Sequence, residues 1–318
     1  MTVGLVFSPQ GSQHVGMGRA LAESSPAASA VFTAADAVLG WSVSDLCWNG
    51  PDEKLTDTRY AQPALLTTGI AAFEALRERT AADGMTVNPT LLAGHSVGEY
   101  AALVAAGAVS LADGLALVSL RGRLMADAAV DGGMTALIGL DRETVASVLS
   151  DPAVAEVVVA NDNAPGQIVI SGPRIALAAA EEAALARGAR RAIRLRVSGP
   201  FHSLSMTPVG DALSAGFGSV TWHDAEPPLV SNVTAEVVRD AGEVRALLAR
   251  QVSSPVEWVR VIECMVAAGV DTFIECGSGS ALVGMIRRIA PAARALAVTD
   301  RASLEAAVSA VVGQPVPA

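Results

Sequence analysis

A serine flanked by two glycines is the residue of this chain best suited to covalent chemistry. Residues 94–98 read Gly-His-Ser-Val-Gly, which matches the Gly-x-Ser-x-Gly pattern of a nucleophile elbow. In such an elbow a strand ends in a sharp turn, a helix starts at once, and the serine Oγ is held exposed. The following helix points its N-terminus at Ser96 and places the Val97 N–H where an oxyanion can accept a hydrogen bond. We therefore predict that Ser96 is the nucleophile of an acyl-transfer reaction.

The serine needs a base, and four histidines are available: His14, His95, His202 and His223. His95 adjoins the serine, but adjacent side chains on a sharp turn point apart, and His223 lies in a proline-rich loop. His202 lies where a predicted inserted subdomain rejoins the main one, and such junctions form clefts. It also follows the nucleophile along the chain, as in serine hydrolases built on α/β sheets. His202 is the favoured base, with His14 open as an alternative and a backbone-bonded loop histidine as the other interpretation of His202.

Arg121 is the second informative residue, because it falls on the apolar face of a helix predicted over 111–129. Its neighbours three and four positions away are apolar, namely Leu117, Val118, Leu124 and Met125. Arg123 falls on the polar face. A buried guanidinium is costly unless acceptors meet it. Two interpretations stay open: an internal salt bridge with an Asp or Glu, and a fork that binds a substrate carboxylate.

The segment Gln10-Gly-Ser-Gln13 follows the first predicted strand, at residues 3–7, directly. Ligands of α/β folds bind at the carboxyl ends of sheet strands. The segment either supplies a second backbone N–H to an oxyanion or is an ordinary strand–helix turn.

The elements that must position these residues follow from the hydrophobic pattern. Helices are predicted at 18–23, 27–39 and 61–82, and a strand at 91–93 leads into the elbow. The chain has 318 residues, of which 51% are hydrophobic, so a large core is expected. The alternation of strands and helices predicts an α/β layered domain with a mainly parallel sheet.

A different pattern occupies residues 133–198. Strands are predicted at 134–139, 157–161, 167–171 and 191–197, with helices at 142–149 and 175–187. That order, βαββαβ, is the ferredoxin-like unit. We predict an inserted ferredoxin-like subdomain at 133–198 within a catalytic domain formed by 1–132 and 199–318, with a further strand at 272–275.

Charge and composition exclude several classes. The formal net charge of −10 argues against nucleic acid as a partner. No uninterrupted apolar stretch is long enough for a membrane span, and the N-terminus reads as a strand rather than a signal peptide. Cys47, Cys264 and Cys276 are odd in number and widely spaced, which predicts a reduced cytoplasmic protein with no disulfide framework and no metal site.

Six ordered motifs carry a family resemblance. They are Phe7–Gln13, Gly94–Tyr100, Leu120–Arg123, Asn163–Gln167, Gly199–His202 and Gln251 with Pro255–Trp258. Together they resemble the malonyl-CoA:acyl carrier protein transacylases and the acyltransferase domains of polyketide synthases, over about residues 3–300. The resemblance implies an α/β-hydrolase-like large domain with a ferredoxin-like insert.

The resemblance also implies a Ser–His dyad. Ser96 would attack a thioester, and His202 would take its proton and return it to the leaving thiol. A backbone carbonyl or the Gln251 side chain would orient the histidine. Backbone N–H groups of Gln10 and Val97 would form the oxyanion hole.

The substrate-binding residues implied are Arg121, Gln251, Phe201 and His95, with Arg121 holding a malonyl carboxylate. Phe201 before the histidine and Val97 after the serine resemble members that use malonyl rather than methylmalonyl. The chain departs from the family at Pro9 and at Gly199-Pro200, which bears on the entrance loop and on this choice.

The expected reaction moves malonyl from malonyl-CoA to the phosphopantetheine thiol of an acyl carrier protein, in fatty-acid synthesis or for a polyketide synthase, with no cofactor of its own. Alternatives are another carboxylated extender unit, a carrier-bound donor, an acyl-thioester hydrolase and a non-catalytic carrier-binding protein. Five arginines in the insert are either a docking patch for an acidic carrier or a solvated sheet edge: Arg187, Arg190, Arg191, Arg194 and Arg196.

Overall fold

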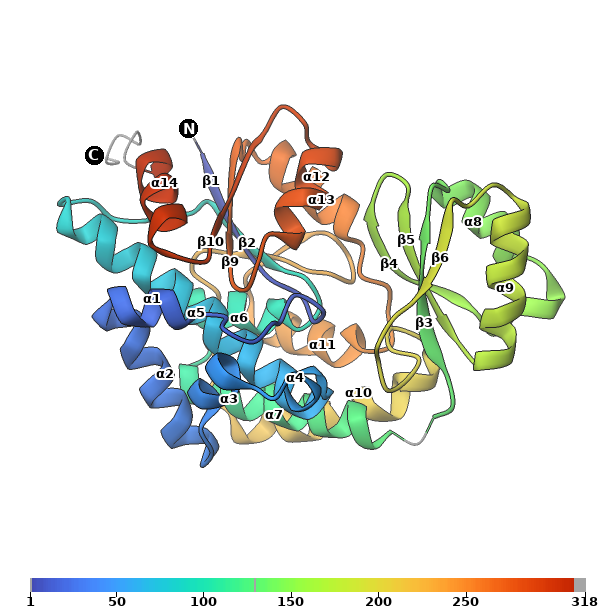
Figure 1. Ribbon diagram of the computed structural model, residues 1–318, viewed down its shortest axis with the longest axis horizontal. Helices are drawn as coiled ribbons and strands as arrows, with labels where there is room; N and C mark the ends of the chain where they lie inside the picture. The colour runs from blue at the N-terminus through green and yellow to red at the C-terminus, as the bar shows by residue number, and fades with distance from the viewer. Residues whose placement is uncertain (1, 129, 312–318) are drawn as a thin grey trace.

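The computed structural model describes residues 2–128 and 130–311 of the chain, so residue 129 and the ends of the predicted catalytic domain at residue 1 and at 312–318 lie outside them. The main sheet has the strand order β10-β9-β1-β2-β7-β8 (Figure 1). The strands are β1 (Val3–Phe7), β2 (Leu91–Gly94), β7 (Leu229–Val230), β8 (Val237–Val238), β9 (Thr272–Cys276) and β10 (Arg294–Val298). All neighbours are parallel except β7 and β8. The predicted mainly parallel α/β sheet is confirmed.

The register of the sheet decides where the site forms. Phe7 at the end of β1 pairs with Gly94 at the end of β2 and with Cys276 at the end of β9. Three strands therefore end side by side, and the loops that follow them meet at one edge. The Gln10 turn and the serine elbow are two of these loops.

Helices cover both faces of the sheet. The larger group packs on the face that carries Leu5 and Phe7, and it includes α2 (Pro26–Leu39), α5 (Thr58–Ala82), α6 (Gly98–Ala105), α7 (Leu111–Asp127) and α14 (Arg301–Val311). On the opposite face, Val6 packs in a second cluster with Trp258 of α12 (Trp258–Ala267) and Leu282 of α13 (Ala281–Ile289). Because successive strand residues point to opposite faces, β1 is buried on both sides.

Shorter elements complete the large unit. They are α1 (Arg19–Ser24), α3 (Val43–Asn49), α4 (Asp52–Thr56), α10 (Thr207–Gly216), α11 (Ala241–Gln251) and the 3-10 turns η2 (Leu204–Met206) and η3 (Phe217–Ser219). Among the described residues no single helix is long and apolar enough to cross a membrane. One bent pair in the same part of the chain, α2 and α3 at 119° to each other, meets that criterion jointly by length and composition.

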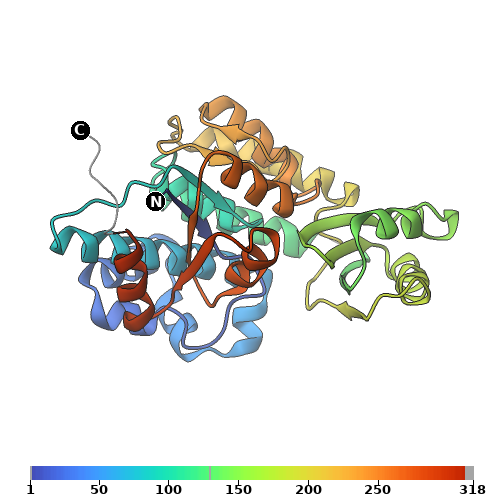
Figure 2. The same cartoon turned by 90° about the horizontal axis from the view of Figure 1, so that it is seen from above.

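A second, antiparallel sheet stands at one end of the molecule (Figures 1 and 2). Its elements are β3 (Gly133–Ile138), α8 (Arg142–Leu149), η1 (Pro152–Val154), β4 (Val158–Ala164), β5 (Gln167–Gly172), α9 (Arg174–Ala186) and β6 (Arg191–Arg194). The strand order β4-β5-β3-β6 with this connectivity is ferredoxin-like. Leu137, Ile170 and Leu177 belong to its own core cluster. The domain boundaries at 132/133 and 198/199 stay a prediction.

Two strands of this sheet end three residues away from their predicted ends, while the other two differ from their predicted bounds by at most one residue at either end. The strand expected over 191–197 ends at Arg194. Arg194 pairs with Thr135 of β3, and only Gly133 and Met134 precede Thr135 in that strand, so β3 is too short to pair with residues up to 197. The strand expected over 157–161 continues to Ala164 through two register shifts, so the segment expected to form the turn is partly strand.

A charged cluster joins the small sheet to the large unit. Arg142 on α8 donates to Asp162 of β4 at 2.8 Å and to Glu257, which precedes α12, at 2.6 and 2.8 Å. Asn161 forms a bridge with Val256 beside it. These contacts fix one edge of the insert against the main unit.

Candidate active site

The Gly-x-Ser-x-Gly segment forms the predicted elbow. β2 ends at Gly94, α6 begins at Gly98, and Ser96 has a φ of 53°, a left-handed conformation that non-glycine residues rarely adopt. A Cβ on Gly94 would lie 1.9 Å from the Gly98 carbonyl carbon, and one on Gly98 would lie 2.2 Å from the Phe7 oxygen. Both positions therefore require glycine, and the elbow is locked against β1.

Asn232, which sequence reasoning missed, holds the elbow from a third strand. It follows β7, and its Oδ1 accepts from the Ser96 backbone N–H at 2.7 Å while its Nδ2 donates to the Gly94 carbonyl at 2.7 Å. The only sequence signal is an Asn at the end of a short apolar run. The side chain satisfies polar groups that the strained turn leaves without backbone partners.

Ser96 and His202 are hydrogen-bonded, with 2.8 Å between Oγ and Nε2. The His202 Nδ1 lies 3.0 Å from the carbonyl oxygens of both Gln251 and Ser254. Carbonyl oxygens only accept, so Nδ1 carries the proton and Nε2 presents its lone pair to the serine. Of the two orienting groups that the family resemblance implies, the backbone carbonyl is the one in contact with His202.

Electrostatics favour the neutral base. His202 is buried, and burial together with the nearby Arg121 charge lowers its pKa to about 3. Burial likewise lowers the pKa of His95 to about 4. An unprotonated imidazole at neutral pH is the form that can accept the serine proton.

Arg121 lies on the buried face of α7, as its spacing predicted, with 1% of its surface exposed, whereas Arg123 is exposed. Its Nη2 donates to Ser96 Oγ and to Gln251 Oε1, both at 3.0 Å. Its Nε has no hydrogen-bond partner among the described residues. No described carboxylate forms an ion pair with it, so the internal salt bridge that the sequence left open is not formed.

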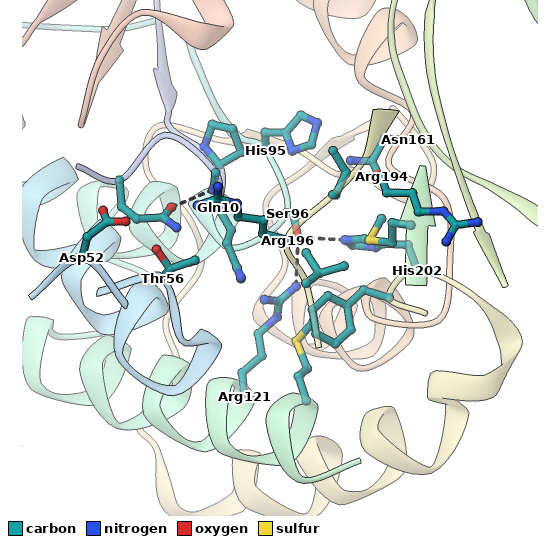
Figure 3. A pocket seen from close by; sticks show the side chains of 18 residues that line it. Gln10, Asp52, Thr56, His95, Ser96, Arg121, Asn161, Arg194, Arg196 and His202 are labelled. Atoms are coloured by element: carbon teal, nitrogen blue, oxygen red, sulfur yellow. Dashed lines mark hydrogen bonds between the residues drawn. The ribbon is translucent and has the colours of Figure 1, made fainter. Parts of the chain in front are cut away.

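A cavity of about 470 Å³ opens above these groups (Figure 3). Six of the predicted site residues line it: Gln10, His95, Ser96, Arg121, Phe201 and His202. Val97 and Gln251 are fully buried beside it. Met125, Met134 and Asn161 also line the cavity, and the sequence analysis assigned no role to them.

The two expected oxyanion donors lie at adjoining strand ends. Neither the Gln10 nor the Val97 backbone N–H donates to another described residue. The Gln10 side chain is anchored by Thr58 Oγ1 at 3.1 Å. Both N–H groups are thus available to a ligand oxygen.

None of the other three histidines is hydrogen-bonded to Ser96 in the described structure. His95 Nε2 lies 2.7 Å from Asn163 Oδ1, and its ring packs against Trp258 at 5.3 Å between centroids. His14 and His223 are exposed and do not line the cavity. His14 is therefore not placed to act as the base of Ser96.

Two of the five arginines predicted as a docking patch in the insert lie at the cavity, and the others do not line it. Arg194 and Arg196 line the cavity (Figure 3), and Arg194 also pairs with Glu181 at 2.9 Å. Arg187 follows α9 and donates to Ser147. No group of three or more His, Cys, Asp or Glu side chains that could hold a metal occurs among the described residues.

A serine on an elbow, a histidine bonded to it and a guanidinium beside it define an enzyme that handles acyl groups through a serine. The comparisons give the family: the acyl transferase domain matches residues 5–313. The chain is 42% identical over 311 residues to the malonyl CoA-acyl carrier protein transacylase of Bacillus subtilis (strain 168), covering 96% of each protein. The chain belongs to the malonyl-CoA:acyl carrier protein transacylase family.

Solved structures agree with the fold. An acyl carrier protein S-malonyltransferase from Vibrio cholerae O1 superposes with a TM-score of 0.91 at 38% identity, covering 96% of this chain and 100% of that one. A malonyl-transacylase in complex with its type II polyketide synthase acyl-carrier protein gives 0.92 at 37% identity, covering 98% and 100%. The predicted fold class is confirmed.

Proposed function

We propose that this protein transfers a malonyl group from malonyl-CoA to the phosphopantetheine thiol of an acyl carrier protein. The names of its relatives support the donor and the acceptor, and the carrier complex of a similar transacylase supports the partner. The partner is a carrier of fatty-acid or polyketide synthesis, and the reaction needs no cofactor beyond the substrate's own thiol arm. A cytoplasmic location stays a prediction.

The reaction proceeds in two halves through Ser96. Its Oγ attacks the thioester carbon, the proton passes to His202 Nε2, and the C–S bond breaks as that proton goes to the leaving thiolate. The carrier thiol then gives its proton to His202, attacks the ester carbon, and Ser96 regains the proton as the C–O bond breaks. The N–H groups of Gln10 and Val97 stabilise the oxyanion of each tetrahedral intermediate.

Arg121 is the single observation that carries the choice of acyl group. The Arg121 guanidinium is almost fully buried and lies 3.0 Å from the nucleophile, and its Nε has no partner in the described part of the chain. Such a group calls for an anionic acceptor inside the cavity. The free carboxylate of a malonyl group bound to Ser96 is such an acceptor, because a planar guanidinium binds carboxylates through bidentate hydrogen bonds.

The remaining cavity residues shape the extender unit. Phe201 is buried beside His202, and its ring fills space that an α-branched acyl group would need. His95, held by Asn163, forms part of the wall next to the serine. Arg194 and Arg196 at the cavity supply positive charge for the phosphates of CoA or an acidic carrier.

Intact-mass spectrometry tests the proposal. Incubation with malonyl-CoA should add one malonyl group to the wild type and none to Ser96→Ala, and holo acyl carrier protein should then remove it and gain the same mass. Acetyl release without malonyl transfer would identify a hydrolase instead. A competition among malonyl-, methylmalonyl- and ethylmalonyl-CoA ranks the extender units.

A further inference from the structure

One buried carboxyl group is connected to the Arg121 guanidinium through a single side chain, and the reaction described above does not use this carboxyl group. Glu99 is in the first turn of α6, three residues after the nucleophile, and only 5% of its surface is exposed. Carboxyl groups are rarely buried to this extent without a defined partner. Glu99 accepts a hydrogen bond from the side chain of Gln251 at the end of α11, and the Asn232 backbone N–H and the Arg121 charge also act on it.

The Gln251 amide joins Glu99 to Arg121. Its Nε2 donates to Glu99 Oε2 at 2.5 Å and to the Ser96 carbonyl at 3.0 Å, and its Oε1 accepts from Arg121 Nη2 at 3.0 Å. The carbonyl oxygen of the same residue also accepts from His202 Nδ1. Gln251 thus contacts both the base and the guanidinium.

An amide has two orientations of nearly the same shape but opposite polarity. The orientation seen here presents oxygen to Arg121, because both hydrogens of Nε2 are taken by acceptors. The reverse orientation would aim N–H groups at a cationic donor. Without Glu99, one Nε2 hydrogen would be buried without a partner, and the amide would lose one of the three hydrogen bonds that fix its orientation.

We propose that Glu99 is a positioning residue: acting through the Gln251 amide, it holds the Arg121 guanidinium at the serine so that carboxylated acyl groups bind. The inference rests on the proposed use of Arg121 for a substrate carboxylate. Glu99 lies outside the cavity lining and does not touch the substrate. Since one carboxyl oxygen can accept in either protonation state, the arrangement needs the acceptor and not the charge.

The test separates carboxylate binding from serine reactivity. Phenylmethylsulfonyl fluoride, a neutral reagent that reacts with activated serines, should label Ser96, and free malonate bound at Arg121 should slow that labelling. In Glu99→Leu the malonate concentration that halves labelling should rise about tenfold, the effect of one lost charge-assisted hydrogen bond. Labelling without malonate should stay within threefold of the wild type.

Glu99→Gln is the conservative rescue, because its amide oxygen can still accept from Gln251, and it should keep malonate protection within threefold of the wild type. Glu78→Leu is the matched control, since Glu78 on α5 is also a partly buried carboxylate that accepts a hydrogen bond, from the Ala27 N–H at 3.3 Å, but it does not line the cavity. It should leave both quantities unchanged.

Three results would overturn the inference: wild-type protection in Glu99→Leu, equal loss in Glu99→Gln and Glu99→Leu, or loss of labelling itself in Glu99→Leu. The last would give Glu99 a role in the fold or the dyad. A wild type that malonate protects but that never transfers malonyl would refute the proposed function and leave this inference standing.

Discussion

Replacing Arg121 by methionine tests the assignment of the acyl carboxylate most directly. Methionine keeps an unbranched, flexible side chain in the buried position on α7 but removes the charge and the hydrogen bonds to Ser96 Oγ and Gln251 Oε1. We expect a large loss of malonyl transfer and a relative gain for acetyl-CoA, which has no carboxylate to hold.

The size of the effect follows from the burial of the group. Removing one partner of a buried charge pair costs about 2–5 kcal/mol, and each 1.4 kcal/mol is a factor of ten. The value of kcat/KM for malonyl-CoA should therefore fall by a factor between about 30 and a few thousand. The value for acetyl-CoA should change by less than about tenfold, because Ser96 Oγ loses the hydrogen bond from Arg121 but keeps its contact with His202 Nε2 at 2.8 Å.

Steady-state transfer to holo acyl carrier protein, with both donors, measures the ratio. Arg123→Met is the matched control, since Arg123 lies on the same helix but is exposed. Equal losses for both donors in Arg121→Met, or unchanged malonyl kinetics, would refute the carboxylate assignment.

Three further changes have defined outcomes. Asn232→Ala should lower the Tm in differential scanning calorimetry and slow serine labelling, because two hydrogen bonds to the elbow are lost; an unchanged labelling rate would contradict its place there. Phe201→Ser should raise the methylmalonyl-to-malonyl ratio in donor competition, and a constant ratio would show that the ring does not limit space. Urea unfolding between pH 6.5 and 4.5 tests the buried groups whose pKa values are shifted. The pKa values of His95 and His202 lie at about 4 and about 3 in the fold, so both groups lower the free energy of unfolding as pH falls below 6.5. The pKa of Glu99 is raised to about 7, so Glu99 raises the free energy of unfolding over the same range. Each such group contributes a slope of about 1.4 kcal/mol per pH unit, so His202→Gln should remove a loss of about 3 kcal/mol between pH 6.5 and 4.5; a pH dependence equal to that of the wild type would contradict the neutral buried imidazole.

The sequence by itself determined the features that depend on neighbours along the chain. The elbow follows from Gly94 and Gly98, since both glycines are forced by contacts that a Cβ would violate. The burial of Arg121 follows from helical spacing, and the βαββαβ order follows from alternating periodicities. The choice of His202 over the other histidines also came from the chain, through its place at the predicted junction.

Only the tertiary structure decided which distant groups complete the site. Asn232 lies 136 residues from the serine it supports, and Gln251 lies 152 residues from Glu99. The short helices α3 and α4 carry too few turns for a clear periodic pattern. Such contacts are set by how strands and helices pack, and a hydrogen bond between segments so far apart leaves no local pattern. The nucleophile Ser96 could therefore be predicted from five consecutive residues. The side chains that orient Ser96 and Arg121, namely Asn232 and Gln251, could be identified only in the folded chain.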